Sequence, residues 1–135
     1  MYVNKHNELR AKTGAGPLTL DRTMADYAQN HVNPCVFKHS SPRKYGENLG
    51  AGYETIGDSI QAWFDEWTNY PFDKPDFYPE SGHFTQVVWK AATKIGCAKK
   101  VCNGANGTPG TYYSCNYDEG NLIGSFDDNV SAPKS

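Results

Sequence analysis

Apolar residues recur with helical periodicity in three segments of the chain, which predicts three amphipathic helices. The first covers residues 2–13 and ends before Gly14. The second begins after Asp21, a residue type that caps helices, and ends before Pro34. The third begins after Thr55 and has the strongest apolar stripe, which consists of Ile56, Ile60, Trp63, Phe64 and Trp67.

The segment Gly82–Trp89 reads GHFTQVVW and combines an imidazole, a hydroxyl, an amide and a large aromatic ring. By periodicity alone, its apolar end fits a buried strand as well as a buried helix. Ser81 directly before it is a residue type that starts helices, so we predict a fourth helix capped by Ser81. A lone histidine beside apolar residues, such as His83, is most often a hydrogen-bonded core residue unless a functional partner is found.

Residues 94–99 and 111–117 predict strands joined by the turn-rich residues 103–110. Residues 35–39 and 123–126 predict two further short extended pieces. The remaining tail is polar, and we expect it to fray after residue 127.

Glycines on both sides of Glu47-Asn48 predict a sharply turned backbone within Gly46–Gly50. Such a turn is usually solvated. Glu66 lies on the flank of the apolar stripe of the third helix, about sixty degrees from Trp63 on a helical wheel. A carboxylate there either reaches into solvent or points into a cleft, and spacing alone leaves both readings open.

Residues 69–81 are stiffened by proline and dense in aromatic side chains. Several adjacent rings are costly to leave in water, so they pack on the body of the protein or contact a ligand. The sequence does not separate these two readings. The residues concerned are Tyr70, Pro71, Phe72, Pro75, Phe77, Tyr78 and Pro79.

A chain of 135 residues is most often one domain, and we expect a single domain over residues 1–135. The formal net charge of -2 provides no basic field to attract phosphates, which argues against nucleic-acid binding. No apolar run reaches the length of a bilayer, so we expect no stable membrane insertion. The start of the chain lacks a basic-then-apolar leader, which fits a mature domain whose leader has been removed.

The four cysteines are Cys35, Cys97, Cys102 and Cys115. Their spacing fits neither a thioredoxin-type pair nor a zinc finger. An even number in a small, loop-rich and tyrosine-rich chain favours two disulfides and an oxidising compartment outside the cell. Three pairings are possible, and the residues alone do not choose among them.

Four segments, in chain order, match one known pattern. They are HNxxR at His6–Arg10, GENL at Gly46–Leu49, GHFTQVVW at Gly82–Trp89 and a CNY…GN motif at Cys115–Asn121. Together they resemble the CAP superfamily, which includes cysteine-rich secretory proteins, insect venom antigen-five proteins and plant pathogenesis-related proteins. The resemblance covers almost the whole chain, and fungal secreted members are similar in character.

The resemblance implies an α/β fold, a three-layer α-β-α sandwich with a small antiparallel sheet. It also implies the disulfides Cys35–Cys102 and Cys97–Cys115. The first closes the longer loop, and the chain-entropy model assigns it about 4 kcal/mol of stabilisation.

The chain departs from the family pattern in four ways. Ala92 replaces a small hydroxyl or amide residue, and the turn after Tyr117 is one residue shorter. The segment from His39 to Glu47 is longer than usual. The cysteine pair that flanks the loop before GHFTQ in plant members is missing, which favours a mobile loop over residues 70–81.

Family members carry two histidines and two glutamates around a central cavity, and the matching residues are His39, Glu47, Glu66 and His83. Two neutral imidazoles beside carboxylates suit a divalent cation, Zn²⁺ or Mg²⁺. We expect the imidazoles to bind the metal and the glutamates to hold bound water. The alternative is a His-Glu hydrogen-bond network that orders the cleft and needs no metal.

A hydrolase is a further alternative, with Ser40 or Thr85 as the nucleophile. Neither residue lies in a nucleophile-elbow sequence. A metal held by two histidines also lacks the third protein ligand of common catalytic zinc sites. We therefore expect no enzymatic activity.

Tyr70, Phe72 and Phe77 follow an aromatic-x-aromatic-x4-aromatic spacing. This resembles the caveolin-binding-type loop by which fungal relatives bind sterols, and Pro71 and Pro75 belong to the same loop. A sterol needs an apolar aromatic slot and one polar contact rather than a reactive centre. Some relatives also hold fatty acids in a groove between the first and fourth helices.

We therefore expect a secreted lipid-binding protein that binds sterols first and fatty acids second, without turnover. A metal-dependent hydrolase that uses the His/Glu cleft is the first alternative. The second is a non-catalytic signalling module that binds a protein partner, which the sequence does not identify.

Overall fold

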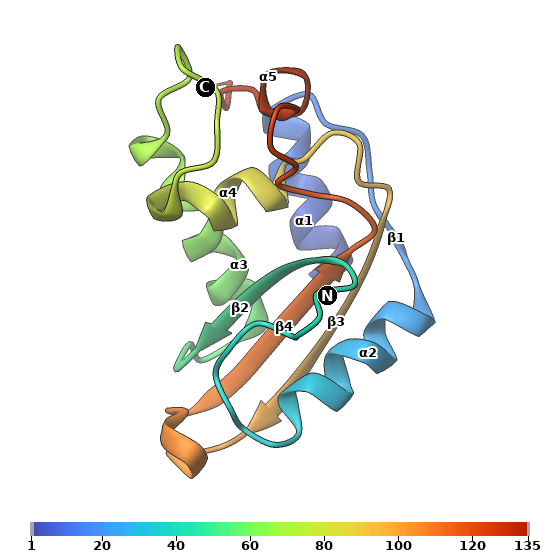
Figure 1. Cartoon of the computed structure of the whole chain (residues 1–135), viewed down its shortest axis with the longest axis vertical. Coiled ribbons are helices and arrows are strands. Elements are labelled where there is room, and N and C mark those ends of the chain that lie inside the picture. Colours follow the sequence, from blue (N-terminus) through green and yellow to red (C-terminus); the bar gives the residue numbers. More distant parts are fainter. Residues whose placement is uncertain (1, 135) are drawn as a thin grey trace.

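The computed structural model describes residues 2–134, which form five α-helices and one four-stranded sheet (Figure 1). The helices are α1 (Tyr2–Lys12), α2 (Arg22–Val32), α3 (Ile56–Asp65), α4 (Gly82–Val87) and α5 (Phe126–Asn129). The strands are β1 (Thr19–Leu20), β2 (Gly46–Ala51), β3 (Lys94–Val101) and β4 (Thr111–Tyr117). Three short 3-10 helices complete the structure: η1 (Glu66–Asn69), η2 (Pro79–Ser81) and η3 (Ala105–Gly107).

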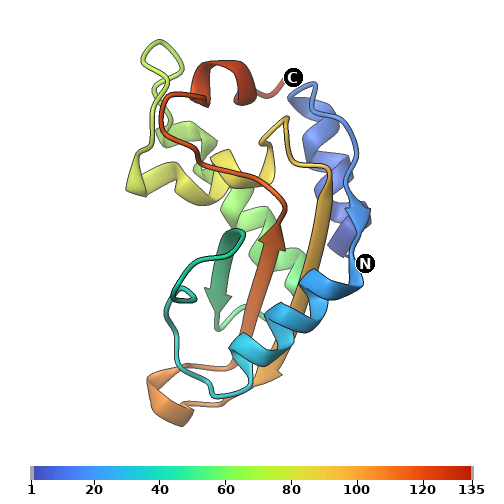
Figure 2. The same cartoon turned by 45° about the vertical axis from the view of Figure 1, so that its right-hand side comes forward.

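The strand order is β1-β3-β4-β2, with β1 parallel to β3 and the other pairs antiparallel. Helix α2 packs on one face of the sheet, and α1, α3 and α4 gather on the other (Figures 1 and 2). The predicted α/β class and three-layer α-β-α arrangement are confirmed. Within residues 2–134, none of the helices has the length and apolar character required to cross a bilayer.

Alternation along β4 explains why both faces of the sheet are covered. Tyr112 faces the α2 side, where it joins Val32 and Leu49 in a small core. Cys115 and Tyr117 face the other side and belong to a larger core with α1, α3 and α4. Because neighbouring side chains of a strand point to opposite faces, a strand that is buried on both faces needs helices on both.

Side chains outside the helices set where the helices begin. Asp21 accepts a hydrogen bond from the Met24 amide (2.9 Å) and Thr55 caps α3 in the same way, so the caps predicted for both helices are confirmed. The cap predicted for α4 is wrong, because the buried Ser81 hydroxyl makes no hydrogen bond within the described chain. The carboxylate of Glu66 accepts from the first amides of α4 instead.

The buried Arg10 fastens α1 to the segment that follows α4. Its guanidinium donates to the carbonyl oxygens of Val87 (3.0 Å), Trp89 (2.9 Å) and Ala92 (3.0 Å), and its Nε donates to Gly16 (2.7 Å). Burial lowers the pKa of Arg10 to about 10, so it remains charged at neutral pH. The contribution of Ala92 is its carbonyl group, which any residue provides.

Three predictions for the sheet region are wrong or incomplete. Gly46–Ala51 is a strand and not a solvated turn, because pairing with β4 supplies hydrogen bonds that the local sequence does not reveal. Residues 35–39 form no strand, and Cys35 has a left-handed backbone with φ of 60°. Strand β1 was not predicted, because it is only 2 residues long.

The third helix is shorter than its apolar stripe predicted. Helix α3 ends at Asp65, and Trp67 lies in η1 and is 37% exposed.

Two predictions near the carboxyl end are also wrong. Residues 123–126 form a turn and the start of α5 rather than an extended piece. The tail is not frayed at Asn129, since this buried side chain accepts a hydrogen bond from the Ala91 amide (2.8 Å).

The two disulfides, Cys35–Cys102 and Cys97–Cys115, are those that the family resemblance implied, so this prediction is confirmed. Cys35–Cys102 joins the end of α2 to the end of β3 and closes a separation of 67 residues. Cys97–Cys115 links adjacent positions of β3 and β4. The longer closure restricts the unfolded chain more strongly.

Candidate functional site

The candidate site lies at β2, which is one of the two edge strands of the described sheet. Glu47 lies opposite Asn116 of β4, and the next residue, Asn48, points to the other face. Glu47 therefore meets His39 on the α2 side, and Asn48 meets His83 on the α4 side. The edge position lets both faces of the strand open onto one cleft.

Glu47 is a fully satisfied carboxylate. One oxygen accepts from His39 Nδ1 (2.8 Å) and the Ser40 amide (2.9 Å), and the other from the Ser40 hydroxyl (2.8 Å) and Asn116 (3.0 Å). Burial alone raises the pKa of Glu47, but these hydrogen bonds outweigh it and lower the pKa to about 2. All of these partners are protein groups, and through one of them Glu47 orients the imidazole of His39.

Glu66 and His83 form the second pair. One oxygen of Glu66 accepts from His83 Nδ1 (2.7 Å), and the other from the backbone amides of His83 (3.0 Å) and Phe84 (3.3 Å). The side chains of His83 and Glu66 are 36% and 23% exposed. The imidazole also stacks on Trp63, with the ring planes 25° apart. Glu66 therefore caps the start of α4 and orients the imidazole of His83.

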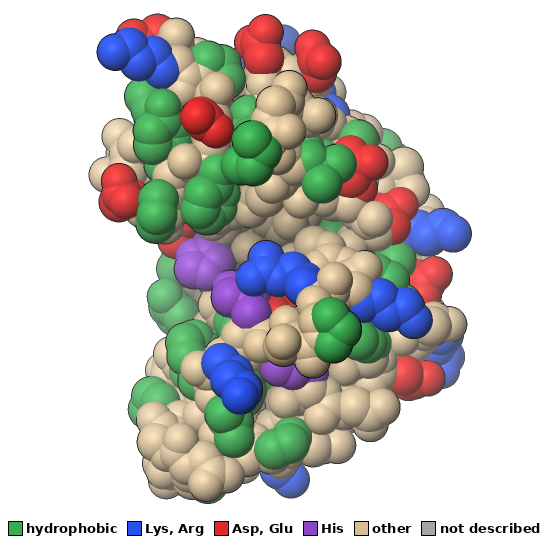
Figure 3. All heavy atoms as spheres, in the orientation of Figure 1, with side chains coloured by type: hydrophobic (Ala, Val, Ile, Leu, Met, Phe, Trp, Pro, Cys, Tyr) green, Lys and Arg blue, Asp and Glu red, His purple; other side chains and the backbone are tan. Residues whose placement is uncertain are grey.

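His39 and His83 line one cleft of about 330 Å³, together with Glu47. Figure 3 shows histidine side chains in the hollow between the upper and lower parts of the molecule, beside basic side chains. The other lining residues are Arg43, Asn48, Phe77, Pro79, Gly82 and Asn121. Glu66 borders a neighbouring groove that also includes His83. Three of the four predicted cavity residues thus share one cleft, and His83 connects it to the fourth.

The residues present suit a metal ion held by few protein ligands better than one that is enclosed by protein ligands. Within residues 2–134, no group of three or more His, Cys, Asp or Glu side chains is arranged to hold a metal ion. The two imidazoles of His39 and His83 each contact a glutamate through Nδ1, which leaves Nε2 for a ligand. Metal-binding histidines typically make this Nδ1 contact. The donor set fits a cation held by two histidines and water, and not a three-ligand catalytic zinc.

The two hydroxyls proposed as nucleophiles are occupied elsewhere. Ser40 donates to Glu47. Thr85 Oγ1 contacts Asn121 Oδ1 (2.6 Å) and the Gly82 carbonyl oxygen (3.0 Å). In the described chain neither hydroxyl is hydrogen-bonded to an imidazole, which is the contact that activates a serine or threonine nucleophile. Neither Ser40 nor Thr85 is therefore an activated nucleophile in this arrangement.

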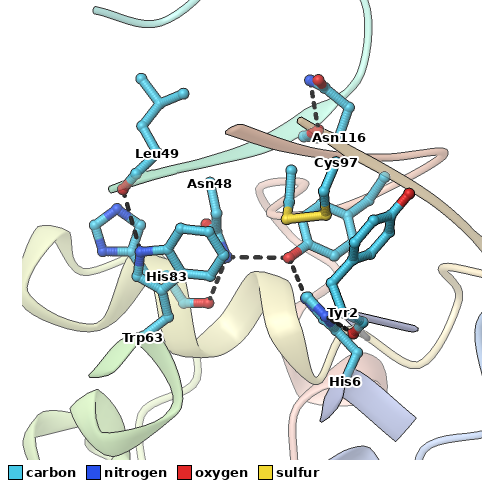
Figure 4. Close-up of a disulfide and its surroundings, with 11 residues drawn as sticks. Tyr2, His6, Asn48, Leu49, Trp63, His83, Cys97 and Asn116 are labelled. Atoms are coloured by element: carbon cyan, nitrogen blue, oxygen red, sulfur yellow. Dashed lines mark hydrogen bonds between the residues drawn. A yellow bond between two sulfur atoms is a disulfide. The ribbon is translucent and has the colours of Figure 1, made fainter. Parts of the chain in front are cut away.

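A buried chain of hydrogen bonds supports His83 from the interior (Figure 4). Asn48 donates to the backbone oxygen of His83 (3.1 Å) and to the hydroxyl of Tyr117 (3.4 Å). That hydroxyl contacts Nε2 of His6 (2.6 Å), whose Nδ1 contacts the carbonyl oxygen of Tyr2 (2.9 Å). Burial lowers the pKa of His6 to about 4 and raises the pKa of Tyr117 above its ordinary range. Both groups are therefore neutral at pH 7, and the tyrosine donates to the histidine.

The aromatic loop divides into an anchored part and an exposed part. The Tyr70 ring is 5% exposed and packs on Phe72 and Phe84, with ring centroids 4.9 Å and 6.0 Å away. Its hydroxyl accepts from the Asp76 amide (3.2 Å), and burial raises the pKa of Tyr70. Phe77 is 42% exposed and lines the cleft. Tyr70 and Phe72 thus cover the edge of the core, and Phe77 is the ring most available to a ligand.

Sequence reasoning missed four polar residues of the site: Arg43, Asn48, Asn116 and Asn121. The three asparagines stand inside the family motifs, so the motifs contained the signal, although the periodicity gave none of them a role. Arg43 lies in the polar loop before β2, to which the sequence gave no role. Only the tertiary structure brings it into the same cleft as His83.

A family model for the cysteine-rich secretory protein (CAP) family matches residues 3–117. The protein PRY2 of Saccharomyces cerevisiae is 44% identical over 133 residues, covering 95% of this chain and 39% of that protein. The secreted protein RBT4 of Candida albicans is 40% identical, covering 90% of this chain and 35% of that protein. Pathogenesis-related protein 1 of Arabidopsis thaliana is 42% identical, covering 87% and 73%. The chain thus spans less than half the length of the two fungal relatives.

Two solved structures are similar over nearly the whole chain. NaASP2 with Zn²⁺ has a TM-score of 0.74 and 28% identity, with 98% of this chain and 84% of that chain covered. The venom allergen-like protein 4 of Schistosoma mansoni has a TM-score of 0.75, 23% identity and coverage of 98% and 92%. The second likeness concerns the fold alone. Both agree with the three-layer arrangement described above.

Proposed function

The chain belongs to the cysteine-rich secretory protein (CAP) family, and from that premise we propose that it is an extracellular protein that binds sterols without turnover. The observation that carries this proposal is the aromatic loop, which is anchored by Tyr70 and presents Phe77 beside the cleft. A flat apolar ligand gains most of its affinity from such a ring and needs only one polar contact. Fatty acids, which share the apolar body, are the second ligand class.

Extracellular location is supported by two kinds of observation. The two disulfides persist in an oxidising compartment. Related proteins include one named as secreted and several named as pathogenesis-related. The lack of turnover is supported by the engaged hydroxyls of Ser40 and Thr85.

Binding of labelled cholesterol to the purified chain tests the sterol proposal. Phe77→Ala should weaken binding by about tenfold, since it removes a largely exposed ring at the cleft. Val101→Ala is the matched control, because Val101 is 60% exposed and lines no part of the cleft. Equal binding by Phe77→Ala and the parent would remove the loop from the site, and no binding by the parent would reject the sterol proposal.

A divalent cation is a second candidate ligand, favoured by the orientation of the two imidazoles. Each Nδ1 is fixed by a carboxylate, so that His39 Nε2 and His83 Nε2 would hold the ion in the cleft. The related structure NaASP2 was determined with Zn²⁺. When bound, such an ion would supply a Lewis-acidic charge beside the sterol loop.

Titration calorimetry with zinc chloride tests this candidate directly. His39→Ala and His83→Ala should each weaken zinc binding at least tenfold if both imidazoles are ligands. His31→Ala is the control, because His31 lies outside the cleft. Zinc binding that survives both substitutions unchanged would show that the ion binds elsewhere.

A further inference from the structure

We propose that the free edge of β3 is a docking site for an extended peptide strand in which apolar and acidic residues alternate. Strand β1 pairs only with Lys94 and Ile95, at the start of β3 (Figure 1). Along residues 96–101 this edge of β3 has no partner strand in the described sheet. Such unpaired edges are where an extended peptide adds a strand to a sheet. The inference does not depend on the proposed lipid binding.

The backbone groups of this edge are available to a peptide. The backbone groups of Lys94 and Cys102 form hydrogen bonds on the β4 side of the sheet. Because alternate residues of a strand bond to opposite sides, Cys97, Lys99 and Val101 direct their backbone groups to the free edge. Among residues 2–134, the amides of these three residues have no hydrogen-bond partner. They are therefore three donors in the spacing that an added strand requires.

One outward carbonyl group already accepts a hydrogen bond from a side chain. Gln29 Nε2 donates to the carbonyl oxygen of Lys99 (3.1 Å), which agrees with the outward direction of this residue's backbone. The same nitrogen also donates to Asn33 Oδ1 (2.8 Å), and both bonds lie at the exposed surface. A docked strand can replace this bond by a backbone amide at little cost.

A groove of about 320 Å³ adjoins the same edge. Tyr2 at the start of α1 and Ile56 at the start of α3 give it apolar walls on one face of the sheet. Gln29 of α2 gives it a polar wall on the other face. The remaining lining residues are Cys97, Ala98 and Lys99. Side chains of an added strand alternate between the two faces, so one set meets the apolar walls and the other meets the polar wall.

The charges of the edge favour acidic residues in the partner. Lys99 and Lys100 are exposed, and neither forms an ion pair within the described part of the chain. The groove lining contains no aspartate or glutamate. Opposite charges on neighbouring strands stabilise their pairing, so an acidic strand complements this edge.

The two lysines also indicate which face the acidic residues occupy. Ala98 packs on the α2 side, so Lys100, two residues further, lies on that side too. Lys99 lies on the other side, opposite Tyr113, where Glu54 and Asp58 are close enough to oppose its charge. The acidic residues of the peptide therefore face Lys100, and the apolar residues face the α1 and α3 side.

A second copy of the chain fits this edge less well. Pairing of two copies brings Lys99 and Lys100 of one copy beside those of the other. Like charges on neighbouring strands destabilise the pairing. Lysines on an edge strand are a common protection against self-association, and the same lysines attract an acidic partner.

Fluorescence anisotropy of a labelled peptide in which valine and glutamate alternate tests the proposal. A peptide of alternating valine and lysine is the control for charge. We expect the valine-glutamate peptide to bind at least about tenfold more tightly than the control. Absence of binding by the valine-glutamate peptide, or equal binding by both peptides, would overturn the proposal.

Two substitutions locate the bound peptide on the protein. Lys100→Glu should weaken binding at least about tenfold, whereas Lys74→Glu, which changes a lysine outside the groove, should have little effect. Val101→Pro removes an outward amide that takes no part in pairing with β4, and it should weaken binding about tenfold. Val101→Ala is the matched control that keeps this amide. Unchanged binding by Lys100→Glu and Val101→Pro would contradict the placement at this edge.

Methylation of the peptide amides separates strand pairing from simple charge attraction. A strand directs alternate amides to the same neighbour. Methylation of one alternate set should therefore abolish binding, whereas methylation of the other set should leave it within about twofold. Equal effects of the two methylated peptides would overturn strand addition. A dimer in sedimentation that Val101→Pro dissociates would assign the edge to a second copy and contradict the proposal.

Discussion

The two His-Glu pairs lie on opposite faces of the same edge strand, and they differ in how completely their carboxylates are used. Glu47 is buried, and both of its oxygens are filled by donors from neighbouring segments. Glu66 stays partly exposed and accepts two of its three hydrogen bonds from the backbone at the start of α4. The Glu47 carboxylate is therefore closed to a ligand, whereas the Glu66 carboxylate remains partly open to one.

Substitution of each glutamate by glutamine should give the largest difference between the two sides. Glu47→Gln places an amide donor against donors from Ser40 or Asn116 in a buried site, and we expect it to lower the free energy of unfolding by roughly 3–4 kcal/mol. Glu66→Gln should cost about 1 kcal/mol, because one oxygen still accepts from the α4 amides and solvent reaches the other. Urea unfolding measures both, and equal losses would refute the distinction.

Acid titration measures the buried carboxylate without mutation. Because the pKa of Glu47 is lowered to about 2 in the folded protein, its stabilisation is complete above the unfolded pKa near 4.5. It is lost as the pH falls toward 2, and amounts to about 3 kcal/mol in full. The urea midpoint should therefore fall across this range in the parent and fall less in Glu47→Gln. An equal fall in both proteins would place the acid sensitivity elsewhere.

His6 adds a second, separable window to the same titration. Burial lowers its pKa from 6.5 to about 4, so the unfolded chain binds the proton more tightly between these values. Stability should decrease as the pH falls from 6.5 to 4, so most of this decrease occurs above pH 4.5, where the Glu47 window begins. His6→Gln should flatten this first decrease and leave the second in place. A first decrease that persists in His6→Gln would assign it to another group.

On the Glu66 side, Tyr70 and Phe77 of the aromatic loop should respond differently to substitution. Tyr70→Phe removes the acceptor of the Asp76 amide, and we expect a loss of about 1 kcal/mol in the free energy of unfolding. Phe77→Ala should change stability by less than about 0.5 kcal/mol, because Phe77 is 42% exposed and lies outside the buried core. A larger loss from Phe77→Ala than from Tyr70→Phe would show that Phe77 belongs to the core.

The last comparison concerns one serine on each side. Ser40→Ala removes a hydroxyl that donates to Glu47 and should cost about 1 kcal/mol. Ser81→Ala removes a buried hydroxyl without a partner in the described chain, so stability should stay the same or rise slightly. Thermal unfolding of the two variants compares them directly. A clear loss in Ser81→Ala would reveal a hydrogen bond that this structure lacks.

Strong local patterns predicted their elements well. Asp21 and Thr55 mark helix starts that the structure keeps, because a capping side chain needs only an amide three residues further along. The segment GENLGA failed, since glycines read locally as a turn and only the partner strand β4 makes it a strand. The prediction of a frayed tail failed at Asn129 for the same reason, because the buried contact of this residue is with Ala91, 38 residues away.

The candidate site divides in the same way. The family resemblance named His39, Glu47, Glu66 and His83, but periodicity alone gave His83 no partner. Ser81 was assigned the start of α4 because it precedes the helix, whereas Glu66 performs that function from a distant segment. A side chain that caps a helix from another element leaves no signal in the local sequence.

The sequence by itself determined the first four helices, the caps of α2 and α3, the strands β3 and β4, and the motifs that identify the family. Periodicity and capping act over a few residues, so they can be read locally. The tertiary structure decided that β2 is an edge strand, that its two faces share one cleft, and that Glu47 is closed while Glu66 is open. These features depend on contacts between segments tens of residues apart, and the burial that such contacts create has no counterpart in the local pattern.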